Sequence, residues 1–151
     1  MTLKTETRYA IDPESAKNLD TTDLRRHFHK EGLFAQGEIN LVYSHYDRLI
    51  LGSAVPGKST LTLDKVAETG THSFLDRREM GILNIGDTGG VRVGGQDHEV
   101  AKGALLYIGM GAGPVEFTGG GRFYITSAPA HRACPTKLVT PSDARRVEMG
   151  S

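Results

Sequence analysis

Short apolar runs, separated by polar and glycine-rich turns, occupy most of the chain after residue 35. In several runs apolar and polar residues alternate, as in Leu61-Thr62-Leu63, and a period of two is typical of a strand with one buried face. Many short strands at fairly regular spacing favour a sandwich or a closed barrel of the jelly-roll type. We predict strands at residues 38–44, 48–51, 60–63, 73–75, 81–85, 91–93, 98–100, 104–108, 115–117 and 122–126.

One segment near the N-terminus has the pattern of a helix. Residues 20–22 offer side-chain oxygens for an N-cap, Leu24 and Phe28 lie one turn apart, and Gly32 suits the position just past the end. Further along, residues 94–97 separate two short strands and begin with two glycines, which is a strong hairpin signal. Residues 135–151 show no periodicity and are interpreted as a connector.

The composition excludes several classes of partner. The 151 residues fit one domain, and 18 basic residues balance 18 acidic ones, so no net charge favours a nucleic acid or an anionic membrane. The N-terminal residues are polar and lack the apolar core of an export signal, and no apolar run is long enough to cross a bilayer. The single cysteine, Cys134, excludes an internal disulfide and a thiolate cluster for zinc. We expect a cytoplasmic protein.

Residues 52–59 match the phosphate-loop pattern G-x4-G-K-[ST], from Gly52 to Lys58 and Ser59. A phosphate loop depends on backbone N–H groups and on the N-terminus of a helix that follows it. Here the next residues alternate as a strand does, so no helix is predicted. A glycine-proline turn with an exposed lysine is the favoured interpretation, and nucleotide binding is the weaker alternative.

His27 and His29 imitate a two-residue metal-ligand pair. Residues two apart share a face on a strand but diverge on a helix. Because this pair falls on the predicted helix, we interpret it as a solvated helix end rather than as a metal site.

Residues 102–121 resemble the second motif of cupin barrels, G-x5-P-x-G-x2-H-x3-N. Gly103 and Gly111 occupy the two glycine positions, whereas Gly109, Pro114 and Thr118 replace the proline, histidine and asparagine. The glycines indicate that the backbone plan of the barrel is retained, and proline has no lone pair with which to bind a metal.

The first cupin motif, G-x5-H-x-H-x3–4-E-x6-G, fits best at residues 73–86. Ser73 and Leu75 then take the two histidine positions, and only Glu79 keeps a ligand type. We therefore predict an all-β fold, a degenerate cupin-type jelly-roll barrel with one short N-terminal helix, that binds no metal itself. Its predicted parts are an N-terminal arm and helix at residues 1–34, the barrel at 35–134 and the connector at 135–151.

Three segments in order are closely similar to one enzyme family. They are LVYSHYDRLILG at residues 41–52, FLDRREMGILNIG at 74–86, and APAH at 128–131 with PTK at 135–137 and VTP at 139–141. These segments resemble the N-terminal half of the 5-keto-4-deoxyuronate isomerases, also called 4-deoxy-L-threo-5-hexosulose-uronate ketol-isomerases. The resemblance extends over nearly the whole chain.

The resemblance implies a two-cupin, cytoplasmic, homohexameric enzyme of pectin and uronate degradation. The family interconverts 5-dehydro-4-deoxy-D-glucuronate and 3-deoxy-D-glycero-2,5-hexodiulosonate, with zinc held by three histidines and a glutamate in the C-terminal cupin. We expect this sequence to stop before that half, so zinc is implied for the full-length enzyme and no bound metal is expected on this chain. The implied partners are the C-terminal cupin half, further copies of the chain in a homo-oligomer, and a uronate-type sugar acid as substrate.

Five residues are candidates for binding that substrate, although no residue of this chain is predicted to be catalytic. Arg48, Arg77 and Arg78 suit a substrate carboxylate, because a guanidinium binds a carboxylate with two parallel hydrogen bonds. His45 and His131 are candidates for polar or proton-relay contacts.

Structural roles are the alternative for each of these candidates. Arg77, Arg78 and Glu79 could form ion pairs at an interface, and the histidines could simply hydrogen-bond a turn or a loop. As a whole, the chain is interpreted as an enzyme half that is inactive alone. The alternative is a stand-alone, non-metal cupin that binds a sugar acid or serves in assembly.

Overall fold

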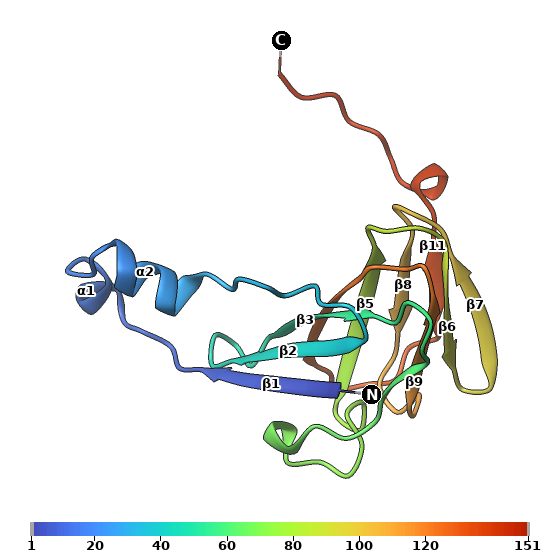
Figure 1. The fold of residues 1–151 in the computed structure, drawn as a ribbon, viewed down its shortest axis with the longest axis horizontal. Coiled ribbons are helices and arrows are strands. Elements are labelled where there is room, and N and C mark those ends of the chain that lie inside the picture. The colour runs from blue at the N-terminus through green and yellow to red at the C-terminus, as the bar shows by residue number, and fades with distance from the viewer. Residues whose placement is uncertain (1, 151) are drawn as a thin grey trace.

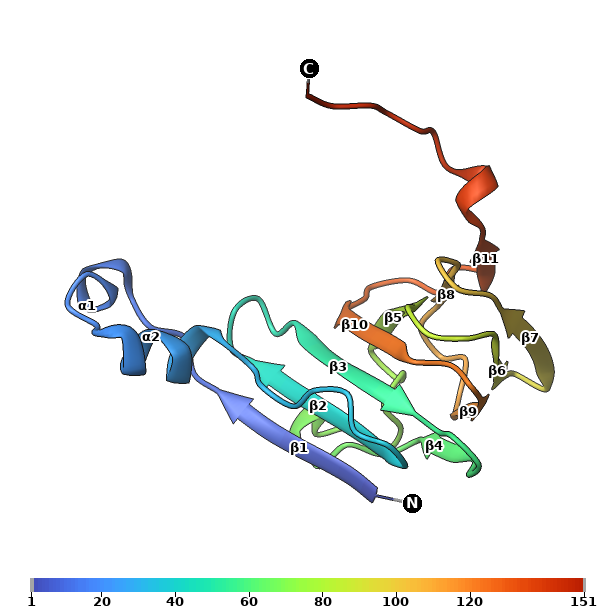
Figure 2. The same ribbon diagram turned by 45° about the horizontal axis from the view of Figure 1, so that its top comes forward.

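Two β-sheets form most of the fold in a computed structural model that describes residues 2–150. A seven-stranded sheet has the order β1-β2-β3-β10-β5-β8-β11, and a four-stranded sheet has the order β4-β9-β6-β7 (Figures 1 and 2). The strands are β1 (Thr2–Arg8), β2 (Glu38–Ser44), β3 (Ile50–Val55), β4 (Leu61–Leu63), β5 (Arg78–Asn84), β6 (Gly89–Val93), β7 (Gln96–Val100), β8 (Leu105–Ile108), β9 (Val115–Gly119), β10 (Phe123–Pro129) and β11 (Lys137–Val139). The helical elements are α1 (Pro13–Ala16), α2 (Thr21–Phe28) and the single 3-10 turns η1 (Ala67–Thr69) and η2 (Pro141–Asp143).

The inward faces of both sheets contribute to one apolar core. Phe117 of β9 and Phe123 of β10 join the two layers, with ring centroids 5.4 Å apart. Ile82, Leu106 and the other inward residues around them are fully buried. Side chains therefore fill the space between the sheets. The predicted all-β, cupin-type jelly roll is confirmed.

Several predicted elements agree closely with the structure. The helix is α2, capped by Asp20, whose carboxylate accepts from the N–H of Asp23. The glycine hairpin connects β6 to β7 through only two residues, Gly94 and Gly95, with φ of 57° and 76°. Two consecutive positive φ values are required by the type I′ turn of a tight hairpin, and glycine adopts them without steric cost.

The strand predicted at residues 73–75 is wrong. Ser73 and Asp76 close a turn, in which the Asp76 N–H donates to the Ser73 oxygen at 3.2 Å and the Ser73 N–H donates to the Asp76 carboxylate at 2.8 Å. Phe74 and Leu75 are apolar because they project into the core from this turn. The strand itself, β5, begins three residues later at Arg78.

Two edge strands were not predicted. β1 pairs in parallel with β2 over seven residues, and β11 pairs antiparallel with β8 over three. Leu3 is the one apolar residue of β1, so this strand carries no alternating pattern. An edge strand that buries little of either face leaves almost no hydrophobic signal.

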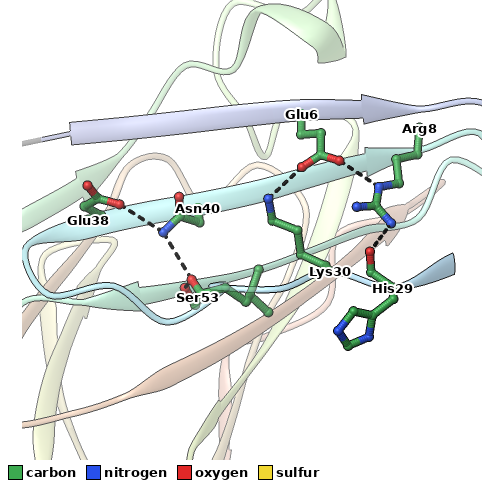
Figure 3. A network of polar contacts seen from close by, with 8 residues as sticks. Glu6, Arg8, His29, Lys30, Glu38, Asn40 and Ser53 are labelled. Atoms are coloured by element: carbon green, nitrogen blue, oxygen red, sulfur yellow. Dashed lines mark hydrogen bonds and ion pairs between the residues drawn. The ribbon is translucent and has the colours of Figure 1, made fainter. Parts of the chain in front are cut away.

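Polar contacts fix residues 29 and 30, which follow α2, to strand β1 of the seven-stranded sheet (Figure 3). The Glu6 carboxylate of β1 accepts from Lys30 at 2.6 Å and from Arg8 at 2.7 Å, and Arg8 also donates to the backbone oxygen of His29 at 2.5 Å. These two cations lower the pKa of Glu6 below its ordinary value of 4.5, mainly through their hydrogen bonds. α1 and α2 extend away from the sheets (Figures 1 and 2).

The residues that resemble a phosphate loop form a strand and a turn. Gly52 lies in β3, residues 56–59 form the connection, and β4 follows, so no helix begins there. His27 lies near the end of α2 and His29 is the residue that caps it. None of the helices in residues 2–150 is long and apolar enough to cross a membrane.

Candidate functional site: a cationic pocket at the mouth of the barrel

One end of the barrel opens into a pocket of about 420 Å³, here called the mouth pocket. It is formed where β2 ends, β5 begins and β10 ends, and the loop after η1 borders it. The residues that line it are Tyr43, His45, Arg48, Thr69, Gly70, Thr71, Arg77, Arg78 and Pro129. The mouth of a β-barrel is a common place for a small-molecule site.

Four of the five candidate residues lie in this pocket: His45, Arg48, Arg77 and Arg78. His131 does not line it, because the chain has left β10 and His131 is exposed in the following loop. Sequence reasoning missed Tyr43, Thr69 and Thr71. Tyr43 lies two residues before His45 at the end of a predicted strand. Because residues two apart on a strand share a face, the spacing could have predicted that Tyr43 lies beside His45.

Arg78 is buried at the base of the mouth pocket, with only 5% of the residue exposed. Its Nε donates to the Ser127 hydroxyl at 3.1 Å, and its Nη2 donates to the backbone oxygens of Ser127 at 3.0 Å and Arg48 at 2.6 Å. Burial lowers the pKa of Arg78; Tyr43 partly opposes this shift, and the nearby charge of Arg48 adds to it. The guanidinium is therefore satisfied on one side by neutral oxygens and lies close to a second cation.

Arg48 lies in a strained turn between β2 and β3. The N–H of Leu49 donates to the Tyr46 oxygen at 3.1 Å, and the two central residues, Asp47 and Arg48, have φ of 53° and 55°. Left-handed backbone is rare for residues with a β-carbon, and asparagine, aspartate and glycine are the usual occupants. The turn therefore places an arginine where local conformation favours glycine.

The His45 ring is held between two tyrosines. It stacks on Tyr9 at a centroid distance of 4.6 Å and meets the edge of Tyr43 at 5.4 Å. Its backbone N–H donates to the Arg8 oxygen at 2.9 Å. His45 thus contributes an oriented aromatic wall to the mouth pocket.

Among residues 2–150 no aspartate or glutamate lines the mouth pocket. Glu79, which follows Arg78, instead accepts a hydrogen bond of 2.7 Å from the hydroxyl of Tyr107. This bond is the main cause of the raised pKa of Tyr107. Within residues 2–150 none of Arg77, Arg78 and Glu79 forms an ion pair, so their pairing across an interface with another chain stays a prediction.

The mouth pocket differs in charge from a second hollow of about 470 Å³ on the outer face of the four-stranded sheet. That hollow is lined by the acids Asp97, Glu99 and Glu116 together with Arg92. The three acids outnumber the single arginine, so this hollow is net negative and repels an anion. The mouth pocket is thus the stronger candidate for binding an anion.

Side chains that could bind zinc do not gather in one place within the described part of the chain. Among residues 2–150 no group of three or more histidine, cysteine, aspartate or glutamate side chains is placed to hold a metal. The positions aligned with cupin ligands do not meet in one pocket, because Leu75 is in the core, Ser73 is in a turn and Pro114 is exposed before β9. By contrast, Gly103 and Gly111 have φ of 83° and 82°, so these glycines serve turns of the fold.

The fold and the pocket define a cupin-type jelly roll with an apolar interior and a cationic mouth. The family model described as KduI/IolB matches residues 27–151, and the chain belongs to this family.

Two curated relatives are similar over nearly the whole chain. One, from Agrobacterium fabrum, is 55% identical over 149 residues, covering 99% of this chain and 54% of the relative; the other, from Cereibacter sphaeroides, is 58% identical over 146 residues, covering 97% and 53%. Both are named 4-deoxy-L-threo-5-hexosulose-uronate ketol-isomerase. The chain spans about half the length of the curated relatives it matches. A solved structure of an IolB-like protein from Salmonella typhimurium is similar with a TM-score of 0.49 and 13% identity, over 63% of this chain and 37% of that one.

Proposed function

We propose that this chain is the N-terminal, cupin-type half of a cytoplasmic 4-deoxy-L-threo-5-hexosulose-uronate ketol-isomerase of pectin and uronate degradation. The observation that carries the proposal is the 55% identity over 99% of the chain to a relative of that name, of which the chain covers 54%. In this role the chain orients and oligomerises a C-terminal cupin half, which holds the zinc.

The division of labour follows from the chemistry that a ketol isomerisation needs. A proton moves between neighbouring carbons, which requires an electrophile at the carbonyl oxygen, a base, and a cation for the substrate carboxylate. The interior of this barrel is filled by apolar side chains, so it supplies neither the electrophile nor the base. The arginines of the mouth pocket are suited to the third task, because no carboxylate among the described residues lines the pocket beside them.

Exposed apolar side chains on the N-terminal segment support the proposed homo-oligomer. Leu24 and Phe28 of α2 are 42% and 51% exposed, and Tyr9 is 71% exposed. Leu24 and Phe28 lie one turn apart and so form an apolar stripe on one face of the helix. Replacing both by serine is expected to reduce the molar mass measured by light scattering, if this stripe contacts another copy.

One observation favours the alternative function of a stand-alone sugar-acid-binding cupin. Among the described residues, three arginines and no carboxylate line the mouth pocket, an arrangement that suits the carboxylate of a sugar acid. Under this alternative the chain would bind a uronate and have no isomerase partner.

The proposal is tested by reconstitution. The chain, the part of the Agrobacterium fabrum relative beyond the matched region, and their mixture are assayed for isomerase activity, and zinc is measured in each by elemental analysis. We expect the mixture to be active, the chain alone to be inactive, and zinc to accompany the added part. Isomerase activity of this chain alone with one bound zinc would overturn the proposed division of labour.

A further inference from the structure

We propose that the mouth pocket is itself a binding site, complete within this chain, for a hexuronic acid held by its carboxylate. The class of ligand rests on the proposed function, whereas the charge of the ligand rests on the geometry of the pocket. The site would bind the sugar acid without the metal-bearing half.

The first argument is an uncompensated charge. Arg78 is 5% exposed and its hydrogen bonds go only to neutral oxygens of Ser127 and Arg48. Among residues 2–150 it forms no ion pair. A buried guanidinium is normally paired with an anion, because removing its charge from water is costly. Arg48 and Arg77 add two further cations to the same lining. A bound anion would therefore offset both the cost of burying the Arg78 charge and the repulsion among the three arginines.

The second argument is the pattern of donors that remain. A guanidinium carries five N–H groups. In Arg78 the Nε and Nη2 atoms hold the protein, which leaves the two N–H groups of Nη1 without a partner among the described residues. The protein bonds fix the plane of the group, so the free donors are oriented before a ligand arrives. Pre-oriented donors bind a carboxylate with less loss of conformational freedom.

The third argument is the strained backbone of Arg48. A residue with a β-carbon at φ of 55° is held in the left-handed region at a cost of about 1–2 kcal/mol. Strained residues of this kind are concentrated at functional sites, where the surrounding structure holds them. Here the bond from Arg78 to the Arg48 oxygen holds the turn, and the turn places a second arginine on the pocket lining.

The remaining walls suit the hydroxyl-bearing part of a sugar. The hydroxyls of Thr69 and Thr71 donate to the backbone oxygens of Val66 and Ser73, so their oxygens can serve a sugar hydroxyl as acceptors. Tyr43 and His45 add aromatic edges to the same lining. The Tyr43 hydroxyl has no hydrogen-bond partner among the described residues. A volume of about 420 Å³ falls in the range of roughly 300–1,000 Å³ usual for small-molecule sites. A concave pocket of this size suits a monosaccharide acid as its ligand better than it suits the surface of another protein.

The experiment titrates the isotope-labelled chain, in the absence of any other half, with D-galacturonate and follows backbone amide signals by NMR. D-galactose is the neutral control, and inorganic phosphate is the anion without a carboxylate. The variants are Arg48→Gln and Arg77→Gln in the pocket, with Arg92→Gln on the outer face of the four-stranded sheet as the matched control. Both pocket substitutions replace exposed side chains, so the fold is expected to be retained.

We expect saturable shifts at residues 43–48 and 77–78 with galacturonate and none with galactose. Arg48→Gln and Arg77→Gln should each weaken binding at least tenfold, and Arg92→Gln should leave it unchanged. The proposal is overturned by absence of saturable binding, by equal binding of galactose, or by pocket variants that bind like the parent. Saturable binding of phosphate but not of galacturonate overturns the assignment of a carboxylate.

The outcome can be separated from that of the proposed function. If galacturonate fails to bind but the mixture with the added half isomerises its substrate, the pocket assignment is wrong and the enzyme-half assignment stands. If galacturonate binds as expected but no mixture is active, the pocket assignment stands and the enzyme-half assignment is wrong.

Discussion

Nη2 of Arg78 lies 2.6 Å from the backbone oxygen of Arg48. This hydrogen bond joins the beginning of β5 to the turn between β2 and β3, two segments that are 30 residues apart in the chain. Because the same guanidinium also binds Ser127 of β10, one buried side chain connects three elements at the mouth of the barrel.

Arg78→Lys is expected to lower the free energy of unfolding by about 2–3 kcal/mol, because an ammonium cannot reach all three oxygens in the geometry of the guanidinium. Urea unfolding measures the change. Arg77→Lys is the control, since Arg77 is exposed and should change stability by less than about 0.5 kcal/mol. Equal stabilities for the two variants would contradict a connecting role for Arg78.

Arg48→Gly is expected to raise the free energy of unfolding by about 1 kcal/mol, because glycine adopts φ of 55° without the steric cost of a β-carbon. The same variant should lose affinity for galacturonate, because the guanidinium is removed. Thermal unfolding measures the gain in stability, and ligand titration measures the loss of affinity. Arg48→Gln keeps the β-carbon and should lose affinity without becoming more stable; a similar gain in both variants would show that strain is not the cause.

Gly52→Ala is expected to destabilise the protein by about 3 kcal/mol or more, an overpacking effect in a central strand. A β-carbon at Gly52 would overlap the Asn40 oxygen and the Leu41 side chain. Gly81→Ala is the matched control in β5, since its β-carbon would meet only the Thr126 methyl group at 3.4 Å. Thermal unfolding of both variants decides the point. Similar midpoints would mean that Gly52 is not required for strand packing.

Glu6 should make the attachment of residues 29 and 30 to strand β1 dependent on pH. Its pKa in the folded chain lies below the ordinary 4.5, because Lys30 and Arg8 hydrogen-bond the charged form. The unfolded chain therefore takes up the proton first as the pH falls. The stabilisation is complete above about pH 4.5 and is lost as the pH falls through the lowered pKa.

Hydrogen exchange of residues 25–34 measures this dependence between pH 3 and pH 6. Glu6→Gln should lower the protection factors of these amides at pH 6 and remove the pH dependence of the protection factors, with an effect of less than about 1 kcal/mol because these side chains are partly exposed. Glu14→Gln alters an exposed pair with Lys17 in α1 and should change nothing in this region. A pH dependence that persists in Glu6→Gln would assign the effect to another group.

The sequence pattern was sufficient for the elements in which one face is buried. β4 alternates throughout and β2 alternates over residues 38–41, because one face of each strand lines the core. Gly94-Gly95 specifies its hairpin through local backbone conformation alone. β1 left no such signal, because its pairing with β2 stabilises it through backbone bonds rather than through buried side chains. Phe74 and Leu75 gave a misleading one, because a turn can bury apolar residues as well as a strand.

The sequence by itself determined the class of fold, the family and the identity of four residues in the mouth pocket, because these depend on composition, spacing and similarity along the chain. Only the tertiary structure decided that Arg78 is buried without a carboxylate, that Glu79 turns instead to Tyr107, and that Thr69 and Thr71 complete the wall. The physical reason is the range of the interactions: hydrophobic alternation reports the burial of each residue locally, whereas the partner of a charge depends on strand register between distant segments.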